Sequence, residues 1–248
     1  MRTLGLLGGM SWESTLVYYR AINQGIARRA GGLHSAPLLV HSFDFERIAA
    51  LQRDSAWDAA AGLLGQAALG LRACGAEGLL IATNTMHKLA PQVQAACGLP
   101  LLHIADAVGA AVREAGLERV GLLGTRFTME QPFLREHLRR HHGLETLIPA
   151  AADRAEVHRV IFEELCRGVV GAASRRFYLE AIDRLAAAGA QGVVLGCTEI
   201  GLLLDPADLP LPAFDSTLLH ARQAIDWILP PPATAGLDDA PALMGDAR

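Results

Sequence analysis

Two stretches of the chain share one pattern, in which a short apolar run ends at a polar or thiol-bearing residue. Residues 76–85 and 190–199 align without a gap, 114 positions apart (197 minus 83), and each follows a helix-like segment that ends at glycine. A short apolar run between turn residues is typical of a strand buried on both faces, so both stretches are predicted as strands of parallel sheets. The first strand ends at Thr83 and the second at Cys197, which therefore occupy equivalent positions.

The first half of the chain carries four such runs with helical patterns between them. The predicted strands span residues 4–7, 37–42, 79–82 and 99–104, and helical periodicity connects Tyr18, Ile22 and Ile26 and also covers 56–73. We expect residues 43–47 to form a loop at the carboxyl end of the second strand. Alternating strands and helices of this kind predict an α/β fold with a parallel sheet.

The pattern then starts again. Residues 120–124 resemble 4–8, the helix end at 185–188 resembles 71–74, and 209–211 resembles 99–101. We interpret the chain as two βαβα halves that arose by duplication, although two unrelated α/β halves could also share apolar strands that end at glycine. The predicted first domain spans 1–104 plus 212–229 and the second spans 105–211. Prolines at 230–232 end the last helix, and we expect 230–248 to form a loosely ordered tail.

Composition and charge exclude several classes of protein. The 248-residue chain is 51% hydrophobic and 19% charged, with a net charge of −4, and no basic stripe points to nucleic acid or to a membrane surface. No apolar run reaches the roughly 18 residues of a transmembrane helix, and the polar start argues against a signal peptide. The four cysteines lie far apart without a CxxC motif, so we expect reduced thiols and a cytoplasmic protein.

Four polar clusters are predicted at the carboxyl ends of strands, where open parallel sheets bind their ligands. The clusters are Gly8-Gly9-Met10-Ser11, Thr83-Asn84-Thr85, Gly124-Thr125 and Cys197-Thr198-Glu199. If the halves are related by a pseudo-two-fold axis, these ends converge on one cleft, and the glycines let backbone N–H groups approach a carboxylate. The nucleotide motifs GxGxxG and GxxxxGK[ST] are absent, so a nucleotide site has little support.

Cys197 is the cysteine in the most reactive context. It lies between a strand and a following segment, where the N–H groups of a helix N-terminus would lower the pKa of a thiol. Cys74, Cys97 and Cys166 are interpreted as structural. Thr83 alone would be interpreted as a hydroxyl bonded to backbone, and its equivalence to Cys197 makes it a candidate for the site.

Other polar residues are weaker candidates. His87 could polarise a partner or cap a helix, and Arg47 and Arg167 could bind a second carboxylate. His137 and His141 have the i, i+4 spacing of metal ligands, but the charged stretch 135–142 is typical of a solvated helix face, so no metal site is expected.

At these clusters the chain resembles the aspartate/glutamate racemase family, within the cofactor-independent Asp/Glu/hydantoin racemase superfamily. The resemblance covers about residues 1–229. The residues that carry it are Gly8-Gly9-Met10-Ser11-Trp12-Glu13-Ser14-Thr15, Thr83-Asn84-Thr85-Met86-His87-Lys88, Leu123-Gly124-Thr125-Arg126-Phe127-Thr128-Met129 and Gly196-Cys197-Thr198-Glu199-Ile200.

The resemblance implies two Rossmann-like parallel-sheet domains related by a pseudo-two-fold, an active site in the interdomain cleft, a homodimer and no cofactor. It also implies a two-base racemase with one thiol on each face of the substrate Cα. Here Thr83 stands where the family usually has a cysteine, as in the L-aspartate/glutamate-specific branch. By position, Thr83 and Cys197 are the catalytic pair. The residues expected to bind substrate are Met10, Gln52, Thr83, Asn84, Thr85 and Thr198, with Arg47 and Arg167 as candidates for the side-chain carboxylate.

The sequence therefore predicts a racemase of aspartate, glutamate or both. Cys197 is the expected acid–base thiol. Threonine is too weak an acid to serve as an anionic base near neutral pH, so Thr83 is expected to donate or relay a proton on the opposite face. Two alternatives stay open, namely a single-thiol dicarboxylate decarboxylase or cis–trans isomerase, and a protein that binds dicarboxylic amino acids without turning them over.

Overall fold

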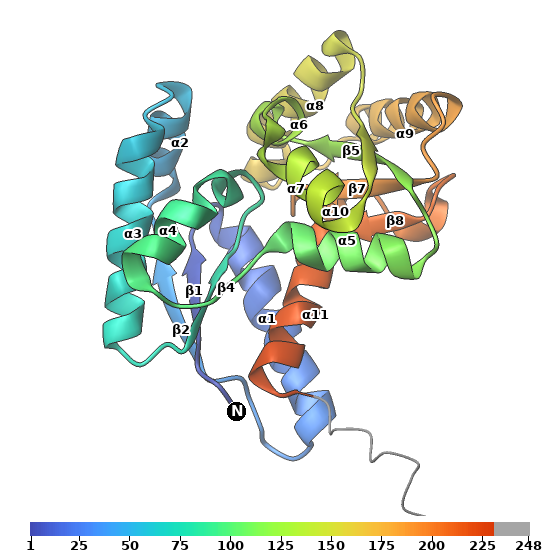
Figure 1. Ribbon diagram of the computed structural model, residues 1–248. Helices are drawn as coiled ribbons and strands as arrows, with labels where there is room; N and C mark the ends of the chain where they lie inside the picture. The colour runs from blue at the N-terminus through green and yellow to red at the C-terminus, as the bar shows by residue number, and fades with distance from the viewer. Residues whose placement is uncertain (231–248) are drawn as a thin grey trace, which may run out of the picture.

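The computed structural model describes residues 1–230, which form two lobes, each built around a four-stranded parallel sheet (Figure 1). The first sheet has the strand order β2-β1-β3-β4 and the second has the order β6-β5-β7-β8. The two halves thus repeat one topology, and the predicted fold class is confirmed. The strands are β1 Leu4–Gly8, β2 Leu38–Ser42, β3 Gly78–Ile81, β4 Leu101–Leu102, β5 Arg119–Gly124, β6 Glu145–Leu147, β7 Gly192–Gly196 and β8 Ala213–Asp215.

Helices connect and cover the strands of both sheets. In the first half they are α1 Trp12–Ala30, α2 Phe45–Arg53, α3 Trp57–Ala73, the 3₁₀ turn η1 Thr85–Leu89 and α4 Ala90–Cys97. In the second half they are α5 Ile104–Glu114, α6 Arg126–Glu130, α7 Pro132–His142, α8 Ala151–Glu163, η2 Leu165–Arg167, α9 Ala172–Ala187, α10 Ile200–Leu203, η3 Pro206–Asp208 and α11 Ser216–Ile228.

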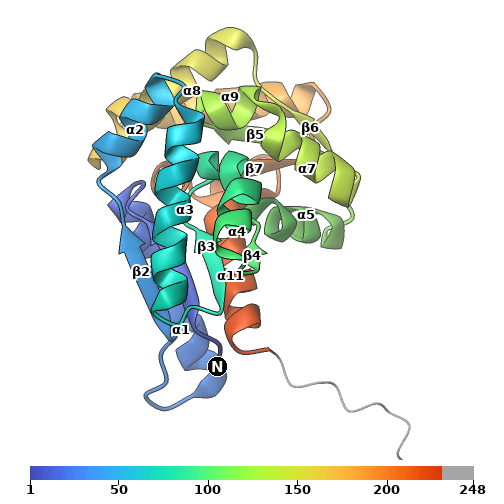
Figure 2. The same cartoon turned by 60° about the vertical axis from the view of Figure 1, so that its left-hand side comes forward.

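The first sheet is buried on both faces, as its uninterrupted apolar strands require. Successive residues of a strand point to opposite faces, so Leu7 packs with α3 and α4 while Leu6 packs with α1 and α11. Figure 2 shows α3 and α4 in front of this sheet and α1 and α11 behind it.

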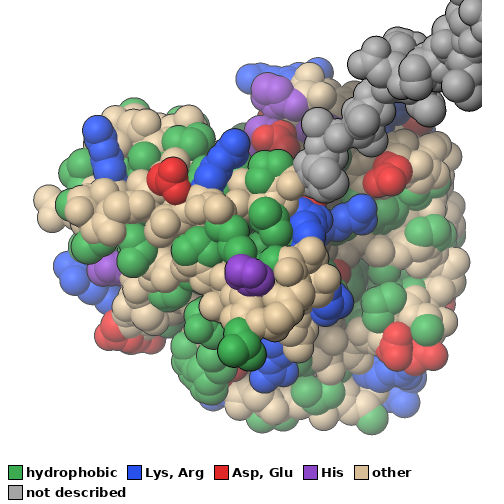
Figure 3. Space-filling view, turned by 90° about the horizontal axis from the view of Figure 1, so that it is seen from below, with side chains coloured by type: hydrophobic (Ala, Val, Ile, Leu, Met, Phe, Trp, Pro, Cys, Tyr) green, Lys and Arg blue, Asp and Glu red, His purple; other side chains and the backbone are tan. Residues whose placement is uncertain are grey.

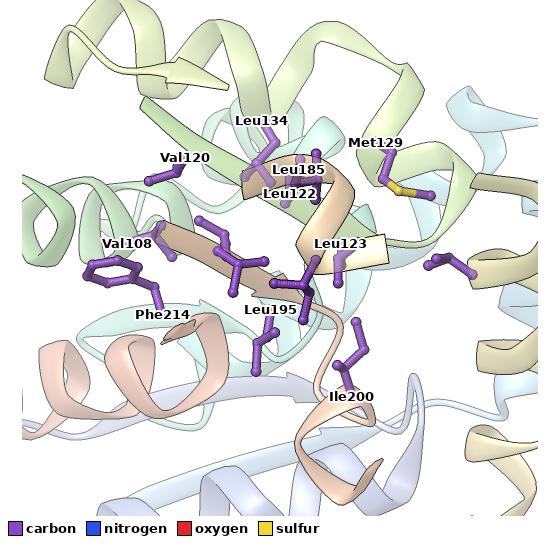
Figure 4. Close-up of a cluster of buried hydrophobic side chains, with 14 of the residues drawn as sticks. Val108, Val120, Leu122, Leu123, Met129, Leu134, Leu185, Leu195, Ile200 and Phe214 are labelled. Carbon is purple, nitrogen blue, oxygen red and sulfur yellow. The ribbon is translucent and has the colours of Figure 1, made fainter. Parts of the chain in front are cut away.

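The second sheet has a core of its own. Leu122 and Leu123 of β5 and Leu195 of β7 lie in it, together with side chains from the surrounding helices (Figure 4). Phe214 of β8 and Val108 of α5 close one end of this core. Thr125 and Cys197 directly follow β5 and β7, so this core holds both residues in place.

Three sequence expectations need correction. Residues 43–47 are not a loop throughout, because Asp44 accepts a hydrogen bond from Glu46 N–H at 3.2 Å and so starts α2 at Phe45. The strand expected over 99–104 shrinks to two residues, because His103 caps α5 by accepting from Ala105 N–H. Residues 213–215, expected in the first domain, form β8 and pair with β7 of the second sheet.

With that correction, the division into two domains stays a prediction. The chain returns to the first lobe in α11, where Ala221, Ala224 and Ile225 pack with Tyr18 of α1 and Leu4 of β1. Of the tail expected over 230–248, residues 231–248 lie outside the described part of the chain.

The described surface matches the modest net charge. On the face in Figure 3, basic and acidic side chains are interspersed with apolar ones. Across residues 1–230, helices with enough length and apolarity to cross a bilayer are absent.

Candidate functional site

A small cavity lies where the carboxyl ends of the two sheets face each other. Its volume is about 30 Å³. Both predicted catalytic residues and every predicted substrate-binding residue except the two arginines line it, while the weaker candidate His87 does not. The lining residues are Met10, Phe45, Gln52, Thr83, Asn84, Thr85, Thr125, Ile161, Phe162, Cys166, Gly196, Cys197, Thr198 and Glu199.

Thr83 and Cys197 reach the cavity from opposite sheets. Thr83 follows β3 and Cys197 follows β7, each the third strand of its half, as the repeated sequence pattern predicts. Met10 arrives from the turn after β1, where Gly9 has φ 80° and a Cβ would lie 2.3 Å from the carbonyl oxygen of Phe43. Glycine is required at this turn because any side chain would strike that backbone.

His87 fixes the backbone beside Thr83. Its Nδ1 lies 2.8 Å from the Thr83 carbonyl oxygen, and its Nε2 accepts from Ile104 N–H at 3.1 Å. Burial and the nearby His220 ring lower the pKa of His87 to about 3, so the ring is neutral. Since its exposed fraction is only 2%, His87 supports the strand end rather than polarising a ligand.

A buried carboxylate, Glu199, is the hydrogen-bonding partner of Cys197. The thiol donates to Glu199 Oε2 at 2.9 Å, and Thr198 Oγ1 donates to the same oxygen at 2.7 Å. The other oxygen, Oε1, accepts from Ser11 at 2.6 Å and from Ser14 at 2.8 Å. Four donors from the two lobes thus converge on the carboxylate of Glu199, and this residue is only 4% exposed.

These contacts set the protonation states of the pair. Burial raises the pKa of Glu199, but the hydrogen bonds from Cys197, Ser11, Thr198 and Ser14 outweigh it, so the pKa lies below its usual range. Burial, followed by the charge of Glu199, raises the pKa of Cys197 well above that of a free thiol. The resting pair is therefore a thiol beside a carboxylate.

The expectation that a helix N-terminus would lower the pKa of Cys197 is wrong. The helix after it, α10, spans only four residues and begins at Ile200, and the residue in its N-cap position is the anionic Glu199. The dipole of so short a helix is weak, and the adjacent negative charge acts in the opposite direction.

The opposite wall offers neutral donors and acceptors. Thr85 Oγ1 lies 3.1 Å from Thr125 Oγ1 and 3.3 Å from Thr128 Oγ1, which makes a triangle of buried hydroxyls. Asn84 donates through Nδ2 to Ser216 Oγ at 3.0 Å, while its buried Oδ1 has no hydrogen-bond partner among the described residues. The hydroxyls of this wall can therefore donate to a carboxylate.

Arg47 and Arg167 lie outside the cavity. Both are exposed, and neither is among the residues that line the cavity, although Arg167 directly follows Cys166, which is. Arg47 precedes Gln52 by five residues on α2, which turns it about 140° away from the face that carries Gln52 into the cavity. Their role in binding a side-chain carboxylate therefore stays a prediction.

Several residues of the site were not singled out from the sequence. Glu199 belongs to a motif already recognised, but nothing in the sequence indicates that Ser11 and Ser14 bind it from the other domain. Cys166, interpreted as structural, also lines the cavity. Burial raises the pKa of Cys166, so it is a neutral thiol.

Comparison with known proteins agrees with this geometry. A Yersinia pestis protein described as a candidate Asp/Glu racemase is 50% identical, with a TM-score of 0.87 over 92% of this chain and 100% of that chain. An aspartate racemase homologue from Pyrococcus horikoshii is 32% identical, with a TM-score of 0.78 over 92% and 99%. An aspartate racemase from Picrophilus torridus, 18% identical with a TM-score of 0.68 over 92% and 94%, shares the fold.

The profile of one family spans nearly the whole described chain. It matches residues 7–224, a range that contains both halves of the cavity and every residue named above as lining it. With two similar sheets, equivalent polar strand ends and this match, the chain belongs to the Asp/Glu/hydantoin racemase family.

Proposed function

We propose that the protein is a cofactor-independent racemase of aspartate, glutamate or both, which moves a proton between the two faces of the substrate Cα. The observation that carries the proposal is the position of Thr83 and Cys197, at equivalent strand ends on the two sides of one cavity. Family membership supports racemisation as the reaction class, and the hydroxyl-rich wall supports an amino-acid carboxylate as the ligand.

The Cys197–Glu199 pair supplies the acid–base group on one face. To act as a base, the Cys197 thiol gives its proton to Glu199 across the existing 2.9 Å hydrogen bond. The resulting thiolate removes the proton from Cα, and the electron pair of the broken C–H bond delocalises into the α-carboxylate. Hydroxyls around that carboxylate stabilise the added charge.

Thr83 supplies the proton on the other face. Its hydroxyl donates to the carbanion and recovers a proton from water, since an alkoxide is far too basic to persist near neutral pH. The hydroxide left by that water takes the proton held on Glu199, which restores the resting state. In the reverse direction, hydroxide removes the Cα proton through the Thr83 hydroxyl, the Cys197 thiol donates its proton to the carbanion, and protonated Glu199 returns a proton to the thiolate. The two faces therefore use chemically different groups.

Substrate entry requires the cavity to widen. A cavity of about 30 Å³ is too small for a dicarboxylic amino acid, since a cavity that admits benzene measures about 150 Å³. Movement of α2 and α8, whose Phe45 and Phe162 rings stack with centroids 6.4 Å apart at the cavity wall, would open it. Such a movement would also change the positions of Arg47 on α2 and Arg167 beyond α8, our candidates for the side-chain carboxylate.

A second copy of this chain is the partner we propose for an exposed apolar surface beside the site. The surface combines Trp12, Leu16 and Val17 of α1 with Leu202 and Leu218, and all five are at least 36% exposed. It adjoins the cavity, since Ser14, Thr198 and Glu199 line the groove between these residues. Sedimentation analysis of Leu16→Glu and of the wild type tests whether this surface forms a homodimer.

The cysteines bear on where the enzyme works. All four are free thiols in the structure. Free thiols, one of them catalytic, suit a reducing compartment, so we propose the cytoplasm.

Isotope exchange in D₂O tests the reaction and the two roles together. Each enantiomer of aspartate and glutamate is incubated with enzyme, and Cα deuteration and racemisation are followed separately. We expect the enantiomer whose proton Cys197 removes to exchange faster than it racemises, and Cys197→Ala to abolish both processes. Cys74→Ala, at an exposed thiol, is the matched control. Racemisation that persists in Cys197→Ala would disprove the mechanism.

The single thiol opposite a hydroxyl also suits a related reaction, the decarboxylation or cis–trans isomerisation of a dicarboxylic acid, in which only one face needs an acid. Release of CO₂, or conversion of maleate without Cα exchange of any amino acid, would favour that reading. Ligand-induced stabilisation without any turnover would instead identify a binding protein.

A further inference from the structure

A group of histidines lies apart from the cavity, between α5 and α7, which pack side by side (Figures 1 and 2). His103 precedes α5, while His137 and His142 lie on α7. The rings of His103 and His137 stack with centroids 3.9 Å apart and an interplanar angle of 8°. These imidazoles surround one carboxylate, that of Asp106 in the first turn of α5.

Asp106 is shared by two imidazole nitrogens. His137 Nε2 lies 2.6 Å from Asp106 Oδ1, and His142 Nε2 lies 3.1 Å from the same oxygen. Three residues each offer one potential ligand atom, and these three atoms all lie within 4.8 Å of one another. The residues are His103, Asp106 and His137. Ligand atoms around a tetrahedral zinc ion are about 3.3 Å apart, given metal–nitrogen bonds of about 2.0–2.1 Å. Binding an ion therefore requires these atoms to move closer together and the stacked rings of His103 and His137 to rotate, since an ion lies in the plane of each imidazole that binds it.

Gly109 makes room for one of these rings. It lies one turn after Asp106 on α5, and a Cβ at this position would lie 2.3 Å from the ring of His142. The ring therefore fits against the bare backbone of α5, which directs its Nε2 to Asp106. A helix face that is only solvated, as predicted for 135–142, would not need a glycine on the neighbouring helix to make room for His142.

We propose that His103, Asp106 and His137 form a binding site for a divalent transition-metal ion, with His142 in reach as a fourth ligand. Nitrogen and carboxylate ligands in a tetrahedral arrangement suit Zn²⁺ best among common ions. The i, i+4 pair His137 and His141, considered from the sequence, is not the ligand set, since His142 rather than His141 reaches Asp106.

The site would join α5 to α7 close to the support of Thr83. The same segment that holds His103 and Asp106 also contains Ile104, whose N–H donates to His87, and His87 in turn contacts the Thr83 carbonyl. Metal binding would therefore stabilise the fold locally. The ion takes no part in the chemistry proposed above, because the ligands lie outside the cavity.

Metal titration of the full chain, without an affinity tag and after treatment with a chelator, tests the site. We expect one Zn²⁺ per chain by calorimetry, a rise in Tm on binding, and the visible absorption bands of tetrahedral Co²⁺ when Co²⁺ is used instead. Asp106→Asn and His137→Gln should each weaken binding by about 100-fold or more, while His34→Gln and His41→Gln, at exposed histidines, should leave it unchanged.

Gly109→Ala separates the fourth ligand from the rest. It displaces the His142 ring without removing any ligand, so weaker binding in this variant assigns His142 to the site, and unchanged binding leaves the three-ligand site intact. The Tm of each variant without metal shows whether the variant is folded. If Gly109→Ala is not folded, His142→Gln takes its place as the test of the fourth ligand. Absence of saturable binding at one ion per chain, or equal binding by the Asp106→Asn and His137→Gln variants, would overturn the proposal.

Discussion

Glu199→Gln is the substitution that tests the acid–base pair most directly. The side chain keeps its shape, but the acceptor of the Cys197 proton loses its charge and its basicity. The four hydrogen bonds to Glu199 can be kept in number, because an amide donates as well as accepts and the surrounding hydroxyls can turn. The change therefore removes a proton acceptor and disturbs little else.

The expected loss of activity is much larger than the expected loss of stability. Replacing four charge-assisted hydrogen bonds with neutral ones costs about 1 kcal/mol each, and most of this is offset because a charge is no longer buried. Loss of a positioned base typically costs about 10²–10⁴-fold in rate, or about 3–5 kcal/mol of barrier. Because enantiomers have equal free energies, kcat/KM must fall by the same factor in both directions.

The assay measures racemisation by polarimetry from each enantiomer across a range of pH, with Tm measured in parallel. The remaining activity of Glu199→Gln should rise with pH, since the thiol must then lose its proton to solvent. Removal of the neighbouring charge should lower the pKa of Cys197, which thiolate absorbance reports. Glu118→Gln, at an exposed glutamate far from the site, is the control. Wild-type activity in Glu199→Gln, or an unchanged pKa of Cys197, would refute the reasoning.

Three further results are expected. Burial lowers the pKa of both His87 and His220 to about 3 in the folded protein, whereas an unfolded histidine has a pKa of about 6.5, so below that pH the unfolded chain binds more protons than the folded one. The free energy of unfolding should therefore fall by about 2 kcal/mol for each histidine between pH 7 and pH 5. Denaturant titration at the two pH values measures this change. Thr85→Val should raise KM by about 10-fold, because a hydroxyl donor worth about 1–2 kcal/mol is lost, and should also lower Tm, because the buried Thr125 and Thr128 hydroxyls lose a hydrogen-bond partner. An unaltered KM would show that this hydroxyl does not bind the substrate. Arg47→Ala should raise KM for aspartate or glutamate, while Arg53→Ala on the same helix should not, and equal effects would exclude a carboxylate contact.

The sequence predicted those parts of the fold that depend on local pattern. Uninterrupted apolar strands and their repetition at a nearly constant spacing were enough to place Thr83 and Cys197 at equivalent strand ends. The start of α2 was missed because its cap is a single aspartate within an alternating stretch. The place of β8 was missed because three residues carry too little pattern to choose between two sheets.

The site itself was predictable only in part, because its electrostatics come from contacts across the two halves. Cys197 was identified from its position, but the direction of its pKa shift was not. That shift depends on burial and on a carboxylate two residues further along, which serines from the other domain hold ionised. For Arg47, the sequence predicted a residue that could bind a carboxylate, and α2 does line the cavity, but Arg47 lies on another face of that helix.

The path of the chain between the lobes has a mechanical consequence. The backbone crosses from one lobe to the other twice, at the start of α5 after β4 and at the start of α11 after β8, and these two helices pack against each other. Two adjacent crossings form a hinge, about which the lobes can rotate but not readily slide. Opening would then be a single rotation that separates Ser11 and Ser14 from Glu199, so the carboxylate would keep all four of its hydrogen bonds only while the lobes are closed.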